Sequence, residues 1–300
     1  MVWQTEDGYV SGAPVQFDGW VYFLYQQRLT SDVPNQLRRV RSGEKPAIVK
    51  VASVECANPF LSSLRILPDA KLGAIQHCVD EDSLLVSIDT ASGTASRLAT
   101  VSPGTDVTLA SVQGRGWLQH AGKGCAAIAP IQEGKRLLSP SFQPAELLGW
   151  RIDQDFGDTS CAVSGRIGFP RYVDDQTLIV LASPESRGVD PGPLGTGRDS
   201  IGWKIYRLDT VANKVELVGG DFTNPVDVEL TIDKCQVMVV GWHKGKSGIW
   251  FTDLATGSVT AVSTVPMVAA SLASDGHAVL SVERSDGRDQ ILRLEIGRPS

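Results

Sequence analysis

Short runs of alternating apolar and polar residues follow one another along the chain, separated by tight turns. In the clearest example, 249–262, one run ends at Asp253, a turn containing Gly257 follows, and a second run begins. Alternation of this kind puts every second side chain on one face of an extended strand. Glycine suits the turn because it adopts a positive φ without steric cost. The pattern therefore predicts an antiparallel hairpin at 249–262.

This hairpin completes a four-stranded repeat that recurs along the sequence. The first two strands of the repeat are predicted at 226–230 and 237–242, which gives a length of about forty residues. The strands predicted for the other repeats are, in order, 14–17, 20–25, 36–41 and 47–52; 61–67, 72–77, 84–89 and 95–101; 108–112, 117–121, 126–131 and 136–138; a strand near 167, then 177–182, 203–209 and 214–218; and 268–272, 278–283 and 290–295. Repeats of this length with four strands each predict a β-propeller.

The last repeat has only three predicted strands, and the N-terminal residues Val2 to Thr5 are expected to supply the fourth. The predicted fold is an all-β, six-bladed β-propeller with four-stranded blades, closed by its N-terminal strand. It is expected to form a single domain over 1–300, with surface insertions at 141–165 and 184–202. Seven blades are the alternative, if 141–165 contains a degenerate one.

Two kinds of turn carry a resemblance to a known family. Ser274-Asp275-Gly276, Leu67-Pro68-Asp69-Ala70 and Phe17-Asp18-Gly19 resemble the Ser-Pro-Asp-Gly turn of the TolB-like propeller repeat, a WD40-like repeat. Asp253 to Gly257 and Asp89 to Gly93 resemble the second hairpin of the same repeat. The resemblance implies a six-bladed, often extracytoplasmic binding scaffold. It departs from TolB because no separate N-terminal α/β domain precedes the repeats, so a place in the Tol-Pal system does not follow.

Composition narrows the functional classes. The net charge of −6 argues against a nucleic-acid partner, which usually requires a basic surface. The sequence has no apolar run long enough to span a bilayer and no cleavable signal at its polar, acidic start. Four scattered His residues offer little material for a metal site, and neither a metal nor a cofactor is predicted.

The common catalytic motifs are absent from the sequence. It contains no G-x-S-x-G elbow, no H-E-x-x-H pair and no phosphate-binding glycine loop between a strand and a helix. No catalytic residue is predicted, and the protein is expected to be a non-catalytic module that binds an unknown protein or small ligand. The alternative is a propeller enzyme of the hydrolase, lyase or cyclase type, with carboxylates or a His at the channel mouth.

The longer connections are predicted to share one face of the propeller. If the strands of each blade are lettered A to D from the centre outward, the A–B and C–D turns are short. The longer segments all join B to C or D to A, and they are 26–34, 54–60, 141–165, 184–202 and 221–226. Insertions concentrate where binding takes place. This long-loop face is therefore the predicted binding surface, chiefly through 141–165 and 184–202.

Candidate contact residues lie in the segment 184–202, which is rich in glycine and proline, and on strands outside it. Its charged side chains offer a polar patch, and further candidates are an arginine on an inner strand, two tryptophans and a histidine at a strand end. The residues are Arg187, Asp190, Arg198 and Asp199 in the loop, and Arg171, Trp203, Trp242 and His243 outside it. The alternatives are a solvated loop, tryptophans that pack between blades, and an arginine and a histidine with structural roles.

The strand pattern also gives the five cysteines positions. Cys56, Cys78, Cys125 and Cys161 are all expected on the long-loop face, which predicts the disulfides Cys56–Cys78 and Cys125–Cys161. Cys235 is expected in a turn on the opposite face as a free thiol. Two disulfides would place the protein outside the cytosol, in the periplasm, at the cell surface or secreted. The alternative is a cytoplasmic protein with five reduced cysteines.

Overall fold

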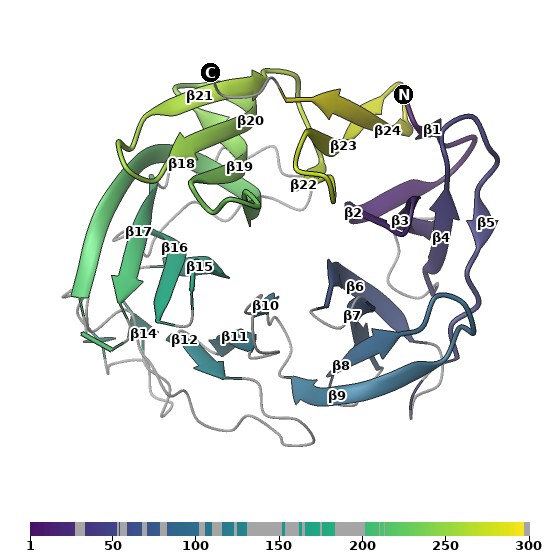
Figure 1. Ribbon diagram of the computed structural model, residues 1–300, viewed down its shortest axis with the longest axis horizontal. Coiled ribbons are helices and arrows are strands. Elements are labelled where there is room, and N and C mark those ends of the chain that lie inside the picture. Colours follow the sequence, from purple (N-terminus) through teal and green to yellow (C-terminus); the bar gives the residue numbers. More distant parts are fainter. Residues whose placement is uncertain are drawn as a thin grey trace. The chain divides into compact units, whose positions relative to one another are not determined.

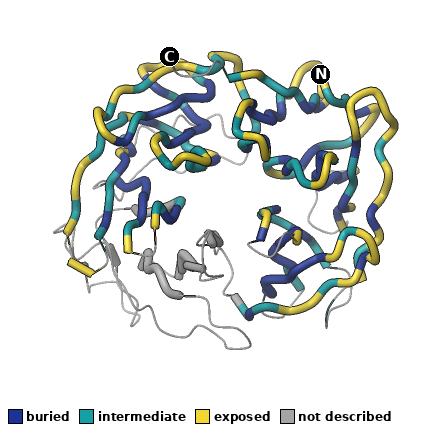
Figure 2. The backbone as a smooth tube through the Cα atoms, viewed as in Figure 1, coloured by how far each residue is buried: buried dark blue, intermediate teal, exposed yellow. Residues whose placement is uncertain are grey.

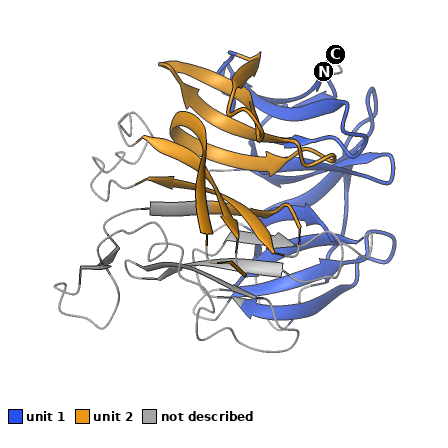
Figure 3. Ribbon diagram, turned by 60° about the vertical axis from the view of Figure 1, so that its left-hand side comes forward, with its two compact units in different colours: residues 1–100, 264–300 blue, residues 101–263 orange. Residues whose placement is uncertain are grey.

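All regular secondary structure in the described part of the chain is β-strand. The computed structural model describes residues 1–27, 34–52, 54, 59–67, 71–78, 83–101, 106–109, 116–122, 125–130, 152–153, 162–163, 166–174, 176–183, 202–209, 211–212 and 214–296. Residues 1–100 and 264–300 form one compact unit, and residues 101–263 form a second (Figure 3). We call them unit 1 and unit 2.

Unit 1 contains three four-stranded antiparallel sheets (Figure 1). The first has the order β2 (Tyr9–Phe17), β3 (Trp20–Gln26), β4 (Gln36–Val40) and β5 (Ala47–Ile48). The second has the order β6 (Phe60–Ile66), β7 (Leu72–His77), β8 (Ser83–Ile88) and β9 (Ala95–Val101). The third has the order β1 (Trp3–Gln4), β24 (Arg288–Glu295), β23 (Ala278–Ser285) and β22 (Ala269–Leu272).

The third sheet joins the two ends of the chain, as the sequence predicts. Strand β1 pairs with β24 in antiparallel register, with Trp3 opposite Ile291 and Gln4 opposite Gln290. The backbone hydrogen bonds extend beyond the strand, because the N–H of Val2 and the N–H of Thr5 also donate to carbonyls of this hairpin. The N-terminal residues therefore supply the fourth strand of the last repeat.

Unit 2 is built around a seven-stranded antiparallel sheet in which the strands follow one another in sequence order. These strands are β15 (Arg166–Tyr172), β16 (Thr177–Ser183), β17 (Trp203–Asp209), β18 (Lys214–Leu230), β19 (Gln236–His243), β20 (Lys246–Asp253) and β21 (Val259–Ser263). A three-stranded sheet contains β10 (Asp106–Leu109), β11 (Gly116–Gly122) and β12 (Cys125–Pro130), and a strand pair contains β13 (Ile152–Asp153) and β14 (Ala162–Val163). The predicted strand 136–138 lies outside the described residues.

One predicted connection is wrong. The segment 221–226 was expected to be a long connection on the long-loop face, but it lies inside the continuous strand β18. The first half of β18 pairs with β17 and the second half with β19, and Phe222 is a register partner of both Trp203 and His243. Asn224 and Pro225 indicate a turn, yet the chain keeps pairing because a bulge between Thr223 and Asp227 accommodates them.

The apolar positions of the alternating runs form the cores. In unit 1, one cluster joins side chains of the first and second sheets, including Tyr22, Leu37 and Leu72. Another joins the first and third sheets through Phe23, Val282 and other buried side chains. Figure 2 shows the result, since the middle strands of the sheets, such as β3 and β23, are mostly buried and the turns are mostly exposed. The sheets of unit 1 thus pack face to face. The first sheet buries side chains of one face against the second sheet and side chains of the other face against the third.

Candidate functional site

The two ends of the first sheet and of the seven-stranded sheet carry different kinds of connection. In the first sheet, Phe17 pairs with Trp20 across a two-residue turn, whereas Tyr25 pairs with Gln36 at the other end, across residues 26–35. In the seven-stranded sheet the segment 184–202 leaves from the end at which Arg166 pairs with Ser183. Some connections at this end are short, such as Lys244-Gly245 between β19 and β20. The connections that vary in length nevertheless gather at one end of these sheets.

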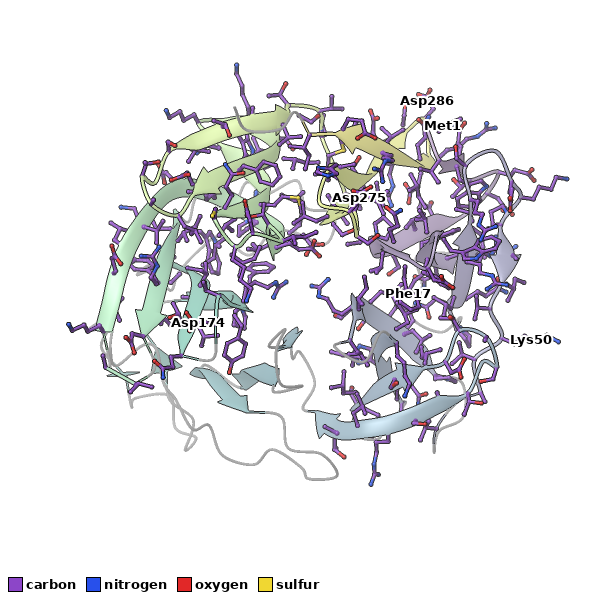
Figure 4. All side chains as sticks on the ribbon, viewed as in Figure 1. Met1, Phe17, Lys50, Asp174, Asp275 and Asp286 are labelled. Carbon is purple, nitrogen blue, oxygen red and sulfur yellow. The ribbon has the colours of Figure 1, made fainter. Side chains whose placement is uncertain are left out.

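The opposite ends are closed by turns built on aspartate. In six of them an Asp carboxylate accepts hydrogen bonds from backbone N–H groups two or three residues further on: Asp89, Asp174, Asp209, Asp233, Asp253 and Asp275. Asp174 and Asp275 are labelled in Figure 4. The backbone N–H of Thr256 is the main cause of the lowered pKa of the Asp253 carboxyl. These carboxylates therefore stabilise turns rather than form a site, and they include Asp89, Asp253 and Asp275, which carry the resemblance to the TolB-like repeat.

Arg171, a predicted contact residue, is buried at 7% exposure within unit 2. Its Nε donates to the carbonyl of Val228 on β18 at 2.8 Å, and its Nη1 donates to the carbonyl of Pro170 at 2.8 Å. Phe169, two residues earlier, has a φ of 55°, and a register shift separates Gly168 from Arg171. The bulge turns the guanidinium toward β18, so its described contacts tie strands of one sheet together.

His243, at the end of β19, is buried. Its Nδ1 lies 2.9 Å from the carbonyl oxygen of Asp221, and its ring packs between Phe222 and Trp250 with centroid distances of 5.3 and 5.1 Å. Strand β18 places Phe222 on one side of the imidazole, and strand β20 places Trp250 on the other. These contacts are those of a packing residue.

The two predicted tryptophans differ in burial. Trp203 is buried within a core cluster of unit 2, and its indole Nε1 has no hydrogen-bond partner among the described residues. Trp242 is half-buried on β19, opposite Thr223 and Ser247. The predicted loop residues Arg187, Asp190, Arg198 and Asp199 lie outside the described residues, so the predicted patch is described only at its margin.

The cysteine predictions are tested in part. Cys78 is disulfide-bonded, and Cys235 is free and exposed, as expected. Cys56 and Cys161 lie outside the described residues, and only the backbone of Cys125 is described. The pairings Cys56–Cys78 and Cys125–Cys161 therefore stay predictions.

The structure brings together a polar group that the sequence analysis missed. Ser62 Oγ on β6 lies 2.7 Å from Nε2 of His77 on β7, and His77 Nδ1 lies 2.9 Å from Ser83 Oγ on β8. Burial lowers the pKa of the His77 imidazole, which favours its neutral form. A hydroxyl beside a neutral imidazole that is oriented by a third group has the geometry of an activated nucleophile. Pairing the predicted strands 61–67 and 72–77 in register would have placed Ser62 near His77.

A second missed group lies at the aspartate-turn end of the first sheet. The guanidinium carbons of Arg39 and Arg41 lie 4.5 and 4.0 Å from the ring centroid of Trp20. The signal was available in the sequence, because residues two apart on one strand face the same way and the predicted strands 20–25 and 36–41 pair. Among the described residues, no group of three or more His, Cys, Asp or Glu side chains could hold a metal ion. In that part of the chain, no helix is long and apolar enough to cross a membrane.

No protein-family model matches the sequence, and no curated protein matches it. The fold is similar to that of TolB from Acinetobacter baumannii, with a TM-score of 0.64, 16% identity and 94% of this chain covered. The chain has a TolB-like fold. It spans 62% of the length of that TolB. A putative TolB from Agrobacterium tumefaciens has a TM-score of 0.55 and 14% identity, with 98% of this chain and 93% of that chain covered.

Enzymes share this fold as well. An oligogalacturonate lyase from Vibrio parahaemolyticus has a TM-score of 0.52 and 9% identity, with 98% of this chain and 91% of that chain covered. At such low identity these similarities establish the fold alone, which confirms the predicted resemblance to the TolB-like β-propeller. Because the TolB structures and an oligogalacturonate lyase share this fold, function has to be argued from the side chains of this chain.

Proposed function

We propose that the protein is an extracytoplasmic, non-catalytic β-propeller that binds a protein or small ligand through its long-loop face. The fold proposed is a single domain of six blades closed by the N-terminal strand. The observation that supports the binding proposal is that short turns and longer connections lie at opposite ends of the sheets. Aspartate turns close one end of the sheets, whereas segment 184–202 and residues 26–35 leave from the other end. A rigid frame with variable connections at one end is the usual arrangement of a binding scaffold.

The extracytoplasmic location rests on the cysteines and on the resemblance. Cys78 is disulfide-bonded, and disulfides persist mainly in oxidising compartments. The contact residues proposed are Arg187, Asp190, Arg198 and Asp199 of the loop, with Trp242 at its margin. Arg171, Trp203 and His243 would act by holding the strands that carry this surface.

The test compares partner capture by three forms of the protein from an envelope fraction. The first is the intact chain, the second lacks residues 185–201, and the third is a matched control, Ile232→Ser. Ile232 is 63% exposed in an aspartate turn at the other end of the seven-stranded sheet. The proposal expects a partner held by the intact chain and by the control and lost by the shortened form. A partner held equally by all three would place the site elsewhere, and capture by none would count against a binding module.

A hydrolase is the second candidate, because of the Ser62–His77–Ser83 group. In that reaction Ser62 Oγ would attack the carbonyl of an ester, His77 Nε2 would take the hydroxyl proton and return it to the leaving alcohol, and water would release the acid. Ser83 can orient the imidazole but, being uncharged, cannot offset the charge of an imidazolium as a carboxylate does. Covalent labelling by a fluorophosphonate that is lost in Ser62→Ala and in His77→Gln, but kept in Ser92→Ala, would favour the hydrolase. Equal labelling of all forms, or none, would exclude it.

A further inference from the structure

Outside the long-loop face, Trp20, Arg39 and Arg41 form a cluster in unit 1 in which two guanidinium groups stack on one indole ring. We call it the Arg-Trp cluster. Strands β3 and β4 pair with Tyr22 opposite Arg39 and Val21 opposite Val40, so the next position brings Arg41 opposite Trp20. Because side chains alternate along a strand, the three cluster residues share the face of Tyr22.

This face anchors the tryptophan. Tyr22 is buried in the core cluster between the first two sheets, and Trp20 packs against that cluster while half-buried. The guanidinium groups of Arg39 and Arg41 lie within 4.5 Å of its ring centroid. Stacking on an aromatic ring restricts a guanidinium while leaving its in-plane N–H donors available. The two cations are therefore held in place before any ligand arrives.

The charges of Arg39 and Arg41 are unmatched in the described part of the chain. Some other arginines there are paired with carboxylates, as Arg207 is with Glu216, Arg284 with Asp289 and Arg293 with Asp275. No hydrogen bond or ion pair joins Arg39 or Arg41 to a carboxylate among the described residues. Both side chains reach solvent at the turn end of the sheet, Arg41 being exposed and Arg39 half-buried.

The surrounding segment is basic although the protein is acidic. Residues 36–52 contain five Lys or Arg side chains and one Glu, whereas the whole chain has a net charge of −6. Lys45 and Lys50 are both exposed, and Lys50 points outward from unit 1 in Figure 4. Asp18 lies in the adjoining turn, so the region is predominantly but not purely cationic. Local positive charge on an acidic protein favours a small acidic ligand over a long polyanion, which the rest of the surface would repel.

We propose that the Arg-Trp cluster is a docking site for an extended acidic peptide segment of a partner protein. The two guanidinium groups stand two residues apart on an extended strand. Carboxylates two residues apart on an extended peptide repeat with the same spacing. Each carboxylate can accept two parallel hydrogen bonds from one guanidinium. The ligand class is thus a peptide with Asp or Glu at alternate positions, and the site is separate from the long-loop face.

The experiment measures binding of a fluorescent peptide of alternating Glu and Ser by anisotropy at low salt. The parent protein should bind it saturably, with an affinity that falls as salt is raised. Arg39→Gln combined with Arg41→Gln should weaken binding roughly tenfold or more, because two charge-assisted contacts are lost. The matched control is Arg38→Gln, which removes a charge from the same strand but from the opposite face, where Arg38 stacks on Tyr25.

Two further comparisons decide between ligands. A peptide of equal charge with Glu at every third position should bind more weakly, and the form lacking residues 185–201 should bind the alternating peptide like the parent. Equal loss of binding in Arg38→Gln and in the double variant would overturn the proposal, as would an absence of saturable binding. Tighter binding of phosphate-bearing lipid vesicles or of a single-stranded RNA than of the peptide would also overturn it. Urea midpoints of each variant separate loss of binding from loss of folding.

Discussion

Replacing Asp289 tests whether one buried carboxylate holds the N-terminal residues to the third sheet of unit 1. Asp289 is fully buried and accepts three hydrogen bonds, from the N–H of Val10 at 2.8 Å and from Nε and Nη2 of Arg284 at 2.7 and 3.0 Å. Its own backbone N–H donates to Thr5 Oγ1 at 2.9 Å. Asp289→Ala keeps the backbone contacts and removes the three bonds to the carboxylate.

The cost follows from what each donor loses. The buried N–H of Val10 is left without its acceptor, which costs about 1–3 kcal/mol. The side chain of Arg284 is 37% exposed, so water can replace most of its ion pair and the loss there is about 0–1 kcal/mol. Asp289→Ala should therefore lower the free energy of unfolding by about 1–4 kcal/mol, a large part of the usual total of roughly 5–15 kcal/mol.

The assay is urea unfolding at neutral pH, with hydrogen exchange of the Val10 amide as a local measurement. Asp289→Asn is the matched variant, since its remaining carbonyl oxygen can still accept from Val10, and it should cost less than half as much. Exchange at Val10 should speed up strongly in Asp289→Ala and only slightly in Asp289→Asn. If Asp289→Ala stays within about 0.5 kcal/mol of the parent, the assignment of this carboxylate as the anchor is refuted.

Three further predictions concern two turns and one buried hydroxyl. Gly257→Ala should destabilise the protein far more than Gly245→Ala, as measured by urea midpoints. Both glycines have φ above 70°, but a Cβ at Gly257 would lie 2.3 Å from a backbone oxygen, whereas a Cβ at Gly245 would meet nothing within 4 Å. Asp253→Asn should reduce the loss of stability on acidification, as measured by unfolding curves at several pH values from neutral to acid. The folded state lowers the pKa of the Asp253 carboxyl, so this group stabilises the fold above its unfolded-state pKa, and that stability is lost as the pH falls through the folded-state pKa. Thr252→Val should leave thermal stability unchanged or raised, because its buried hydroxyl has no hydrogen-bond partner among the described residues.

Each of these has an outcome that contradicts it. Equal costs for the two glycine substitutions would mean that the turn at Gly257 relaxes away from the close contact. An unchanged pH dependence in Asp253→Asn, matched by the control Asp286→Asn in another turn, would mean that the carboxylate charge is not what the turn uses. A clear drop in melting temperature for Thr252→Val would show that the hydroxyl has a partner.

The sequence predicts the strands well because each alternating run ends at a residue with a specific turn chemistry. Asp253 is followed by Gly257, and the structure pairs the flanking strands β20 and β21. The pairing of β1 with β24 was also predictable, since a three-stranded repeat leaves an open edge. The continuous strand β18 was not predictable in this way. Gly219, Gly220 and Pro225 indicate a loop, and the segment is a strand only because β17 pairs with its first half and β19 with its second half.

Side-chain roles were harder to predict than strands. The sequence gives no sign that His243, at the end of an alternating run, is buried, and only the path of β18 shows that Phe222 packs against it. The Arg-Trp cluster and the Ser62–His77 contact each depend on register between two strands. Register decides which side chains meet across a sheet, and a residue shift in either strand would reverse the face of every side chain. These residues could therefore be predicted from the sequence only if the register of the paired strands were known.

The pairing of β1 with β24 has a consequence for how the protein is made. Unit 1 takes strands from 1–100 and from 264–300, whereas unit 2 uses one continuous stretch of chain. During synthesis Trp3 has no partner strand until Ile291 has left the ribosome, so the third sheet of unit 1 forms last. Contacts between such distant residues also slow folding, because the chain must first lose the entropy of a long loop. Until then the apolar side chains of the N-terminal segment stay accessible, which makes nascent-chain length a determinant of aggregation for this protein.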